Sequence, residues 1–535
     1  MGKAAVTGFM GSDNTPACGP TGVMATAYLH REIGRNTGSP SGGCVTQLEA
    51  REGQAGPFGV SERSIVPWKP ANLGGGKGPQ FKVNVRSGES QEIGVSLTPS
   101  TSVRKLQDTL HAKAKKAPSY RFYALYDKMY REDILGFAYW CCLGNRGAPG
   151  VEGQTFEDIE AYGYERWLDE LAEELREQRY GPQAVRRVYI PKPDGKQRPL
   201  GIPTIKDRVV QMAALLVLEP IFEADLQPEQ HAYRPGQSAL DAVQKVQALL
   251  KSGHTEVVDA DLSGYFDSIP HAELMKSVAR RVSDGRLLGL IKAWLETPVE
   301  EEDERGRKKR TTRNKDEGRG TPQGAPLSPL LANLYMRRFI LGWKSQGHQR
   351  RLDAHIVNYA DDFVICCRGT AAKAMTVMRG MMAKLKLTVN ETKTRLCRVP
   401  DEHFDFLGYT FGRYYSPRTG GAYLGVRPSA KKVHTICLRI SEQTQRRWGF
   451  LDPEELVGRL NRILRGWANY FCLGAVSAAY SIVDRHVCFR LRQWLGRRTR
   501  VQGSSRSRYS EPYLRRTYGL FKLTGRPRRP SCANA

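Results

Sequence analysis

Residues 355–365 read His355-Ile356-Val357-Asn358-Tyr359-Ala360-Asp361-Asp362-Phe363-Val364-Ile365 and place two adjacent aspartates between two apolar runs. Short apolar runs on either side of a turn predict a strand, a tight turn and a second strand. Neighbouring carboxylates repel each other and are costly to desolvate, so a chain that fixes them between buried strands usually gives them a cation. Taken alone, Asp361 and Asp362 are equally well explained as turn formers.

A second acidic strand, Glu256-Val257-Val258-Asp259-Ala260-Asp261-Leu262, precedes this hairpin in the chain and is followed by Ser263-Gly264-Tyr265-Phe266-Asp267. Phosphoryl transfer to a growing chain needs carboxylates from separate elements, and such sites hold two metal ions about 4 Å apart. Asp261, Asp361 and Asp362 are therefore the candidate ligands of a divalent-metal site of the polymerase type. The pairing favours a metal site over simple turn formation.

The charge of the chain points to a polyanionic partner. The 535 residues include 82 Lys or Arg against 55 Asp or Glu, a net charge of +27, and 40% are hydrophobic. A surface this positive gains from releasing counterions condensed on phosphates, so nucleic acid is the first candidate. Residues 431–535 carry 22 basic and 6 acidic residues, so most of the excess lies in the last fifth of the chain. The length allows about three or four domains.

Cysteine usage and hydropathy favour a cytoplasmic protein. The eleven cysteines include the adjacent pairs Cys141-Cys142 and Cys366-Cys367 but no Cys-x-x-Cys, which argues against a zinc module and a disulfide framework. The longest apolar run, Val209 to Leu218, is too short for a membrane span and is interrupted by Gln211. The N-terminus lacks a signal-peptide pattern. We therefore expect a cytoplasmic location and no membrane partner.

The first part of the chain divides into two regions. Residues 1–95 are rich in Gly, Ser, Pro and Thr without a sustained apolar period, so we expect a largely disordered or loosely docked extension that could include translated leader. From Val103 the spacing becomes helical and basic, and an amphipathic helix is predicted from Tyr164 to Gln178. Residues 96–180 are thus predicted to be a helical, RNA-binding lead-in.

A basic hairpin is predicted between Arg186 and Pro203, where Pro193-Asp194-Gly195 closes a turn between two short strands. Lys192 and Arg198 flank this turn. A solvated surface hairpin explains the segment, but the two cations could also grip a triphosphate, Arg through its bidentate fork and Lys as a point charge. The mixed-charge run from Val299 to Arg319 is interpreted as an exposed hairpin or insertion without chemistry of its own.

A rigid loop, Gly320-Thr321-Pro322-Gln323-Gly324-Ala325-Pro326-Leu327-Ser328-Pro329, precedes an apolar helix from Leu330 to Trp343. Ser328 is the expected N-cap and Pro329 stands in the first turn. Gln323 could be ordinary loop polarity, although an amide beside glycine also allows close approach to a nucleotide.

The segment after the acidic hairpin completes an α/β arrangement. A helix is predicted from Ala371 to Leu385, then come Leu387–Thr394 and the apolar Phe404–Tyr409. Lys393 is most simply a surface residue, but near a diphosphate leaving group it could act as a general acid.

The C-terminal region is predicted to be a basic helical bundle. Leu456, Leu460, Leu464 and their neighbours have helical apolar spacing with arginines between them, and we expect Trp467, Tyr470 and Phe471 in the core. Arg462 and Arg465 are the better candidates for RNA contact.

The order of these motifs resembles that of the reverse transcriptases encoded by group II introns, over Asn145 to roughly Arg500. The resemblance rests on Asp261–Asp267, Thr321–Gly324, Tyr359–Asp362, Lys393-Thr394, Phe406-Leu407-Gly408, and, for the maturase or thumb domain, Leu460–Phe471.

The resemblance implies a right-hand polymerase fold, with α/β fingers and palm over residues 181–415, a helical thumb or maturase domain over 416–500 and a basic tail over 501–535. It implies that Asp261, Asp361 and Asp362 hold two Mg²⁺ ions. Lys192, Arg198 and Gln323 would contact the incoming deoxynucleotide, and Phe266 would exclude a ribose 2′-hydroxyl.

The implied function is that of an RNA-directed DNA polymerase that also binds its intron RNA as a maturase, promoting splicing and intron mobility. A primer 3′-hydroxyl would attack the α-phosphate of a deoxynucleotide on an RNA template. DNA primer and target would be further partners. The alternatives are a domesticated enzyme of phage defence or repair, and an RNA-binding splicing factor with a vestigial polymerase fold.

The chain departs from the family pattern at three places. Asn358 stands where the family often has Arg, and Ala325 stands where a glycine is usual after Gln323-Gly324. Many relatives end in a Cys- and His-bearing DNA endonuclease domain, whereas Cys532 is the only such residue after Arg500 here. We therefore expect no DNA-cleaving domain, and a mobility that uses reverse splicing and a primer supplied elsewhere.

Overall fold

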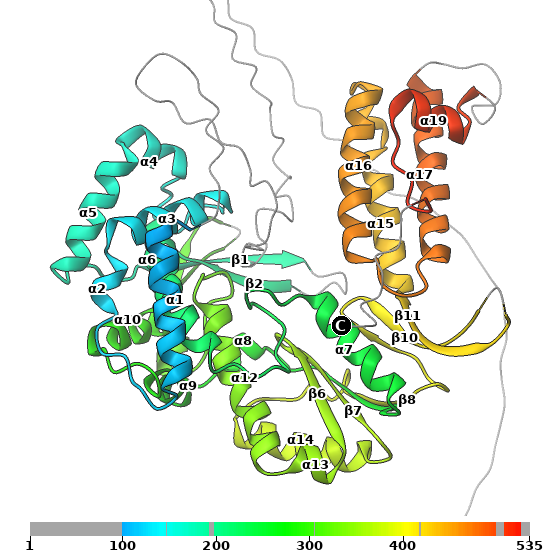
Figure 1. Ribbon diagram of the computed structural model, residues 1–535. Helices are drawn as coiled ribbons and strands as arrows, with labels where there is room; N and C mark the ends of the chain where they lie inside the picture. Colours follow the sequence, from blue (N-terminus) through cyan, green and yellow to red (C-terminus); the bar gives the residue numbers. More distant parts are fainter. Residues whose placement is uncertain are drawn as a thin grey trace, which may run out of the picture. The chain divides into compact units, whose positions relative to one another are not determined.

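The computed structural model describes residues 99–145, 147–191, 197–303, 305–416, 419–498 and 508–525 (Figure 1). The predictions for residues 1–95 and for Lys192 therefore lie outside the described residues. So does the Pro193-Asp194-Gly195 turn.

Among the described residues, five helices form the N-terminal region, and three of them, α1, α2 and α3, pack against the long helix α6. Their bounds are α1 Thr101–Lys116, α2 Tyr126–Met129, α3 Glu132–Gly144, α4 Phe156–Tyr162 and α5 Tyr164–Arg176. Helix α6, Ile205–Glu223, is buried on nearly every side, as its largely apolar sequence favours, and both α1 and α3 lie along it (Figure 1). The N-terminal helices and the polymerase body consequently share one hydrophobic core.

The fingers carry a four-stranded sheet in the order β2-β1-β4-β5. Strand β1, Val185–Pro191, pairs antiparallel with β2, Gln197–Ile202, which confirms the predicted basic hairpin. Strand β4, Val299–Glu302, pairs in parallel with β1 and antiparallel with β5, Lys308–Thr311. The mixed-charge run is thus a hairpin as expected, but it also completes the fingers sheet.

The palm is a second four-stranded sheet in the order β6-β7-β3-β8, with bounds β3 Glu256–Ala260, β6 Ala354–Tyr359, β7 Asp362–Cys367 and β8 Arg395–Arg398. Successive residues along its strands point to opposite faces of the sheet and pack into different hydrophobic cores. Val257 and Val364 pack with helix α7, Ala239–Lys251, whereas Val258 and Phe363 pack with the core that contains helix α14, Ala371–Lys384. This period of two shows that both faces of the sheet are covered.

Shorter helices connect these parts. Their bounds are α8 Tyr265–Ser268, α9 His271–Ala279, α10 Gly285–Glu296, α11 Arg313–Asp316, α12 Ser328–Ser345 and α13 His348–Arg351. Helix α12 has Pro329 in its first turn, as predicted. The prediction that Ser328 is its N-cap is wrong, because Leu327 holds that position and the Ser328 hydroxyl instead bonds Thr321 Oγ1 at 2.7 Å.

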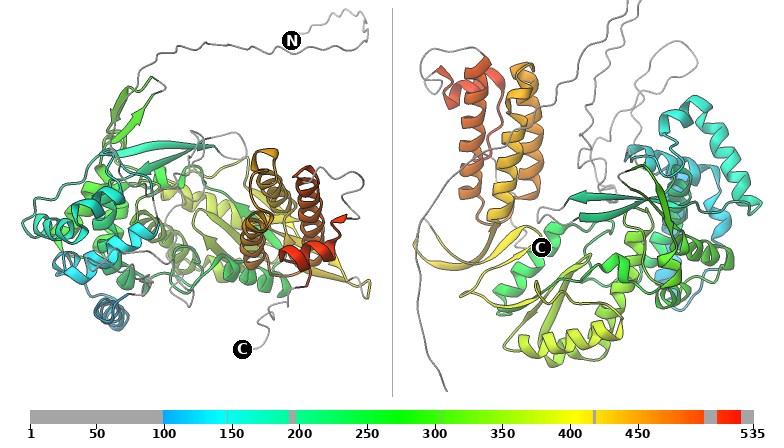
Figure 2. Two further views of the ribbon diagram at one scale, coloured as in Figure 1. Left: turned by 90° about the horizontal axis from the view of Figure 1, so that it is seen from above. Right: turned by 180° about the vertical axis from the view of Figure 1, so that it is seen from behind.

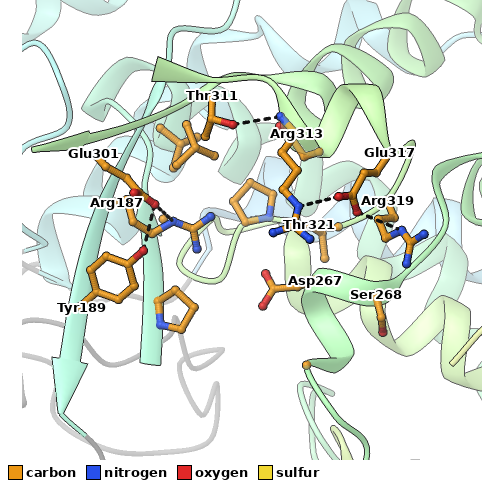
Figure 3. A pocket seen from close by; sticks show the side chains of 18 residues that line it. Arg187, Tyr189, Asp267, Ser268, Glu301, Thr311, Arg313, Glu317, Arg319 and Thr321 are labelled. Atoms are coloured by element: carbon orange, nitrogen blue, oxygen red, sulfur yellow. Dashed lines mark hydrogen bonds and ion pairs between the residues drawn. The ribbon is translucent and has the colours of Figure 1, made fainter. Parts of the chain in front are cut away.

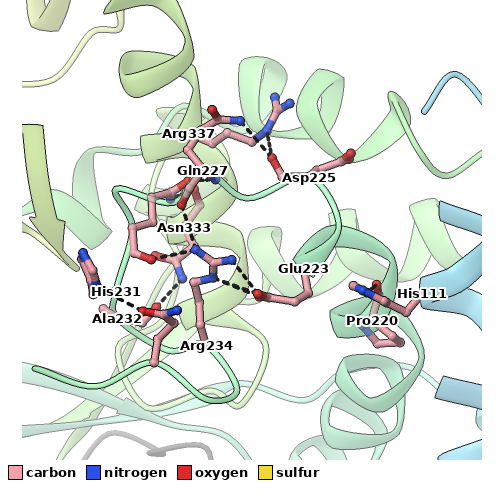
Figure 4. A network of polar contacts seen from close by, with 12 residues as sticks. His111, Pro220, Glu223, Asp225, Gln227, His231, Ala232, Arg234, Asn333 and Arg337 are labelled. Carbon is pink, nitrogen blue, oxygen red and sulfur yellow. Dashed lines mark hydrogen bonds and ion pairs between the residues drawn. The ribbon is translucent and has the colours of Figure 1, made fainter. Parts of the chain in front are cut away.

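A polar network holds the loop after α6 against strand β6 (Figure 4). Arg234 forms an ion pair with Glu223, and its Nη1 donates to the carbonyl oxygens of Gln227 and Gln230, both at 2.8 Å. The same loop donates from the His231 amide to the Asn358 carbonyl at 3.0 Å. This network brings the loop beside the end of β6, where the acidic turn begins.

The C-terminal part consists of a three-stranded sheet and a helical bundle. Strands β9 Phe404–Phe406, β10 Tyr409–Tyr415 and β11 Ala422–Pro428 lead into α15 Ala430–Gln443, the 3₁₀ helix η1 Arg446–Trp448, α16 Pro453–Tyr470, α17 Ser477–Arg498 and α19 Glu511–Tyr518. Helices α15, α16 and α17 run side by side in both views of Figure 2. Leu514, Leu520 and Leu523 belong to the bundle core, so the helical region extends beyond the predicted boundary at residue 500.

Within the described ranges, no helix is both long enough and apolar enough to cross a membrane.

Candidate active site

The acidic turn is a two-residue hairpin between β6 and β7. Tyr359 pairs with Asp362, which leaves Ala360 and Asp361 as the two central residues. Ala360 has φ +59°, a left-handed conformation that is rare outside glycine and is favoured by such hairpin turns. The buried amide of Asn358 donates to the carbonyl oxygen of Ala360 at 2.8 Å and lies 3.4 Å from that of Asp362. Asn358, a departure from the family pattern, therefore holds this turn in place.

Strand pairing brings Asp261 to the same place as the acidic turn. Ala260 pairs with Phe363 across β3 and β7, so the next residues along, Asp261 and Asp362, lie opposite each other on one face. The three candidate aspartates thus come together although they are distant in sequence.

Two residues from the segment after α14 fix Asp261. Asn390 donates from Nδ2 to Asp261 Oδ2 at 2.9 Å, and the Lys393 ammonium lies 3.2 Å from the same oxygen. A backbone hydrogen bond also links the two segments, because the Asn390 amide donates to the Asp261 carbonyl at 2.8 Å. Lys393 is therefore part of the site, while Asn390 was not predicted, since an asparagine in Val389-Asn390-Glu391 suggests only a turn.

The site accumulates negative charge. Desolvation and the neighbouring charges of Asp361 and Asp261 raise the pKa of Asp362 to about 7. Desolvation and the charge of Asp261 also raise the pKa of Asp361, against the lowering effect of Arg198 and Lys393. Clustered carboxylates with too little compensating positive charge fit a divalent cation with hard oxygen ligands, such as Mg²⁺.

The loop that contains Gln323 lies against fingers strand β2. The Gly201 amide donates to the Gln323 carbonyl at 2.8 Å. Gly324 has φ +128°, and a Cβ there would lie 2.5 Å from the Gly201 carbonyl oxygen, so this close approach requires glycine. Arg198 lies on the same strand and is near enough to the acidic turn to influence the pKa of Asp361.

Phe266 lies on helix α8, which directly follows Asp261–Gly264. Its ring is half-buried, and its carbonyl accepts a hydrogen bond from the Thr321 amide at 2.8 Å. The adjacent Tyr265 is buried and donates to the Ala332 carbonyl at 2.7 Å, which anchors this short helix to α12. Phe266 and the loop of Gln323 are therefore held together by the backbone.

A pocket of about 430 Å³ opens beside this region, between the fingers sheet and α8 (Figure 3). Asp267 and Thr321 line it together with charged residues of the fingers. Arg313 pairs with Glu317 at 2.5 Å, and Tyr189 donates to Glu301 at 3.0 Å. The mixed-charge segment thus forms one wall of a pocket next to the candidate nucleotide-binding residues.

Tyr233 is a further neighbour of the aspartates that was not predicted. Desolvation and the charge of Asp361 raise its pKa above the ordinary range, and its backbone has φ +54°. It reaches the site through the loop that Arg234 fixes. Nothing in the local sequence indicates that this tyrosine meets residues more than a hundred positions away.

The two arginines predicted to bind RNA are exposed on helix α16. Arg462 lines a groove of about 210 Å³ between α15 and α16, together with Lys432, Arg439 and Trp467. Arg465 lies over the Phe521 ring at 5.2 Å. Of the three aromatic residues predicted to lie in the core, Phe471 is buried, whereas Trp467 and Tyr470 are half-buried and pack against the core.

Comparison with known proteins gives two family matches. Residues 190–411 match the family model described as reverse transcriptase (RNA-dependent DNA polymerase), and residues 433–511 match the group II intron, maturase-specific domain.

Individual proteins are also similar to this chain. The protein YkfC of Escherichia coli (strain K12) is 33% identical over 57% of this chain and 87% of its own length. The group II intron-encoded protein LtrA of Lactococcus lactis subsp. cremoris is 32% identical over 42% of this chain, which spans only 36% of LtrA. Among solved structures, a chain of a partial Cas6-RT-Cas1–Cas2 complex aligns with a TM-score of 0.29 and 21% identity, over 48% of this chain and 42% of that one.

The fold and the two domain matches define a reverse transcriptase that carries a maturase domain. The chain belongs to the family of group II intron-encoded reverse transcriptases and maturases. Membership implies use of a divalent metal and binding of intron RNA, and it agrees with the resemblance found in the sequence.

Proposed function

We propose that Asp261, Asp361 and Asp362 bind two Mg²⁺ ions and that the site extends a DNA primer on an RNA template. The observation that carries this proposal is the pairing of β3 with β7, which sets Asp261 opposite Asp362 beside the acidic turn. When bound, the ions activate the primer 3′-hydroxyl and neutralise the diphosphate leaving group. In this proposal the three carboxylates bind the ions, and the residues around them keep the carboxylates in position.

The surrounding residues orient the substrates. Asn390 and Lys393 keep the Asp261 carboxylate facing the site, and the Lys393 ammonium is available to protonate the diphosphate as it leaves. Arg198 and Gln323 contact the incoming deoxynucleotide, with Lys192 as a third contact. Phe266 is proposed to exclude a ribose 2′-hydroxyl, as the resemblance implies. Backbone hydrogen bonds linking Gly201, Gln323, Thr321 and Phe266 support these assignments.

The helical region is proposed to bind intron RNA and to support its splicing. Arg462 and Arg465 are exposed, and Arg462 shares its groove with Lys432 and Arg439. Such a cationic groove suits a phosphate backbone. We assign the fingers and palm to residues 181–415 and the thumb from residue 416 onward, in a cytoplasmic protein whose described cysteines are free thiols.

The polymerase proposal is tested by deoxynucleotide incorporation on a primed RNA template with Mg²⁺. The variant Asp361→Asn plus Asp362→Asn keeps the shape of both side chains and is expected to abolish metal-dependent synthesis. Asp401→Asn is the matched control, because its carboxylate is 80% exposed and makes only a distant pair with Arg413. Synthesis by the double variant at the wild-type rate would contradict the assignment.

The RNA-binding proposal needs affinities measured at one ionic strength, because phosphate contacts weaken steeply with salt. Arg462→Ala and Arg465→Ala are expected to weaken binding of the cognate intron more than binding of a random RNA of equal length. Equal losses for both RNAs would assign these arginines to non-specific phosphate contact instead.

A further inference from the structure

A cluster of two histidines and an aspartate lies at the other end of the palm sheet from the acidic turn. His254 comes just before β3, and Asp353 and His355 lie at the start of β6. Both strands pair antiparallel with β7, so they begin at the same edge of the sheet. Seven residues separate His254 from Asp261, which at about 3.3 Å per residue places the cluster roughly 20 Å from the polymerase site.

The three side chains converge on one point. Asp353 Oδ1 lies 3.1 Å from His254 Nε2 and 3.5 Å from His355 Nε2, and the three ligand atoms all lie within 4.8 Å of one another. Ligand atoms bound tetrahedrally at about 2.0–2.1 Å from a metal are roughly 3.3 Å apart, so the two distances from Asp353 Oδ1 to the histidine nitrogens are close to those around a shared ion.

The hydrogen bonds around His254 leave the lone pair of its Nε2 directed at the point where the three side chains converge. The single hydrogen of the Ser252 hydroxyl is donated to the Leu249 carbonyl at 2.8 Å. Ser252 Oγ must therefore accept the Nδ1–H of His254, which lies 2.9 Å away. The Nε2 of a neutral His254 then presents its lone pair to the Asp353 carboxylate. Two such acceptors at 3.1 Å need a cation between them, either a metal ion or a proton.

The ligand set selects the kind of ion. Imidazole nitrogens suit zinc, cobalt, nickel or copper, whereas Mg²⁺ prefers oxygen ligands. A hydrogen bond that fixes the tautomer, as from His254 to Ser252, is the usual support of a metal-binding histidine. Arg368 lies 3.6 Å from Asp353 Oδ2, the other carboxylate oxygen, and weakens the attraction for a cation without blocking Oδ1.

We propose that His254, Asp353 and His355 bind one Zn²⁺ ion through Nε2, Oδ1 and Nε2, with water as the fourth ligand. The ion joins the starts of β3 and β6 across the end of β7 and braces the palm sheet at the edge away from catalysis. This inference does not depend on the proposed polymerase chemistry.

The test uses the full-length protein, stripped of metal with a chelator and then titrated with Co²⁺ in saturating Mg²⁺, which occupies the acidic site. We expect one equivalent of Co²⁺ with visible ligand-field absorption, displacement by Zn²⁺, and a rise in Tm on adding Zn²⁺. His355→Gln should weaken Co²⁺ binding by more than about tenfold. Asp353→Asn, which keeps the side-chain shape, serves if the histidine variant does not fold.

Two controls separate this site from others. Asp361→Asn plus Asp362→Asn should keep the Co²⁺ absorption, because those residues lie at the opposite end of the sheet. Absence of the absorption in folded wild type, or equal binding by Asp353→Asn, would overturn the proposal and leave a proton shared between His254 and Asp353.

Discussion

Replacing the buried Arg281 should destabilise the protein far more than replacing its neighbour Arg280. Arg281 follows helix α9 and is fully buried. Its guanidinium donates to four carbonyl oxygens in the last turn of α1 and the segment after it, those of Ala114, Ala117, Pro118 and Tyr120. The last turn of a helix leaves carbonyls without partners inside the helix, so Arg281 supplies the hydrogen-bond donors that these carbonyls lack.

The size of the effect follows from these contacts. A hydrogen bond from a charged donor contributes about 1.5–3 kcal/mol, so losing two of the four without replacement costs about 3–6 kcal/mol in Arg281→Met. Arg281 and Arg280 both form an ion pair with Asp225, but the Arg280 side chain is 40% exposed. Arg280→Met is therefore expected to cost about 1 kcal/mol or less.

The assay is urea unfolding at neutral pH, followed by tryptophan fluorescence. With an m-value of about 3 kcal/mol/M or more, Arg281→Met should lower the unfolding midpoint by roughly 1 M and Arg280→Met by roughly 0.3 M at most. Equal shifts in the two variants would refute the reasoning, because they would mean that burial of the guanidinium carries no extra stability.

Three further predictions concern single side chains. Desolvation beside Glu223 raises the pKa of Glu219 from 4.5 to about 7, so its contribution to stability is full below pH 4.5 and is lost as the pH rises through 7. Glu219→Gln should therefore raise the free energy of unfolding by about 2 kcal/mol at pH 8, with no gain at pH 4.5 in the same urea assay. Phe266→Ala should increase incorporation of ribonucleotides relative to deoxynucleotides, and an unchanged ratio would count against its proposed role. Tyr470→Phe removes the 2.7 Å hydrogen bond to the Leu407 carbonyl and should cost about 1 kcal/mol in urea unfolding, whereas no change would mean that water replaces the phenol.

Local sequence patterns predicted much of the palm. The apolar runs within residues 355–365 and the acidic strand at 256–262 predicted β6, β7 and β3, and helix α14 lies within one residue of its predicted end. The Phe406-Leu407-Gly408 motif was recognised only by resemblance. Its role is visible in the backbone, since Leu407 and Gly408 both have positive φ and form the tight turn between β9 and β10.

Contacts between distant residues could not be predicted in the same way. His254 and His355 meet because β3 and β6 start at one edge of the sheet, and Tyr233 meets Asp361 because Arg234 fixes its loop. Helix α19 was missed because Glu511–Tyr518 is mostly polar and is preceded by a Ser- and Arg-rich stretch. Its few apolar residues can be recognised as core residues only when the bundle against which they pack is known.

The single core shared by the N-terminal helices and the palm has a consequence for synthesis of the chain. Leu143 of α3 belongs to the same core as Leu387, so the early helices leave the ribosome before much of their core exists. At about 5–20 residues per second, their last partners follow roughly 10–50 s later. Until those partners have been synthesised, the apolar surface of α6 is exposed to chaperones and to other nascent chains. The bundle formed by α15, α16, α17 and α19 does not have to wait for distant core partners, because its core lies wholly within residues 433–523.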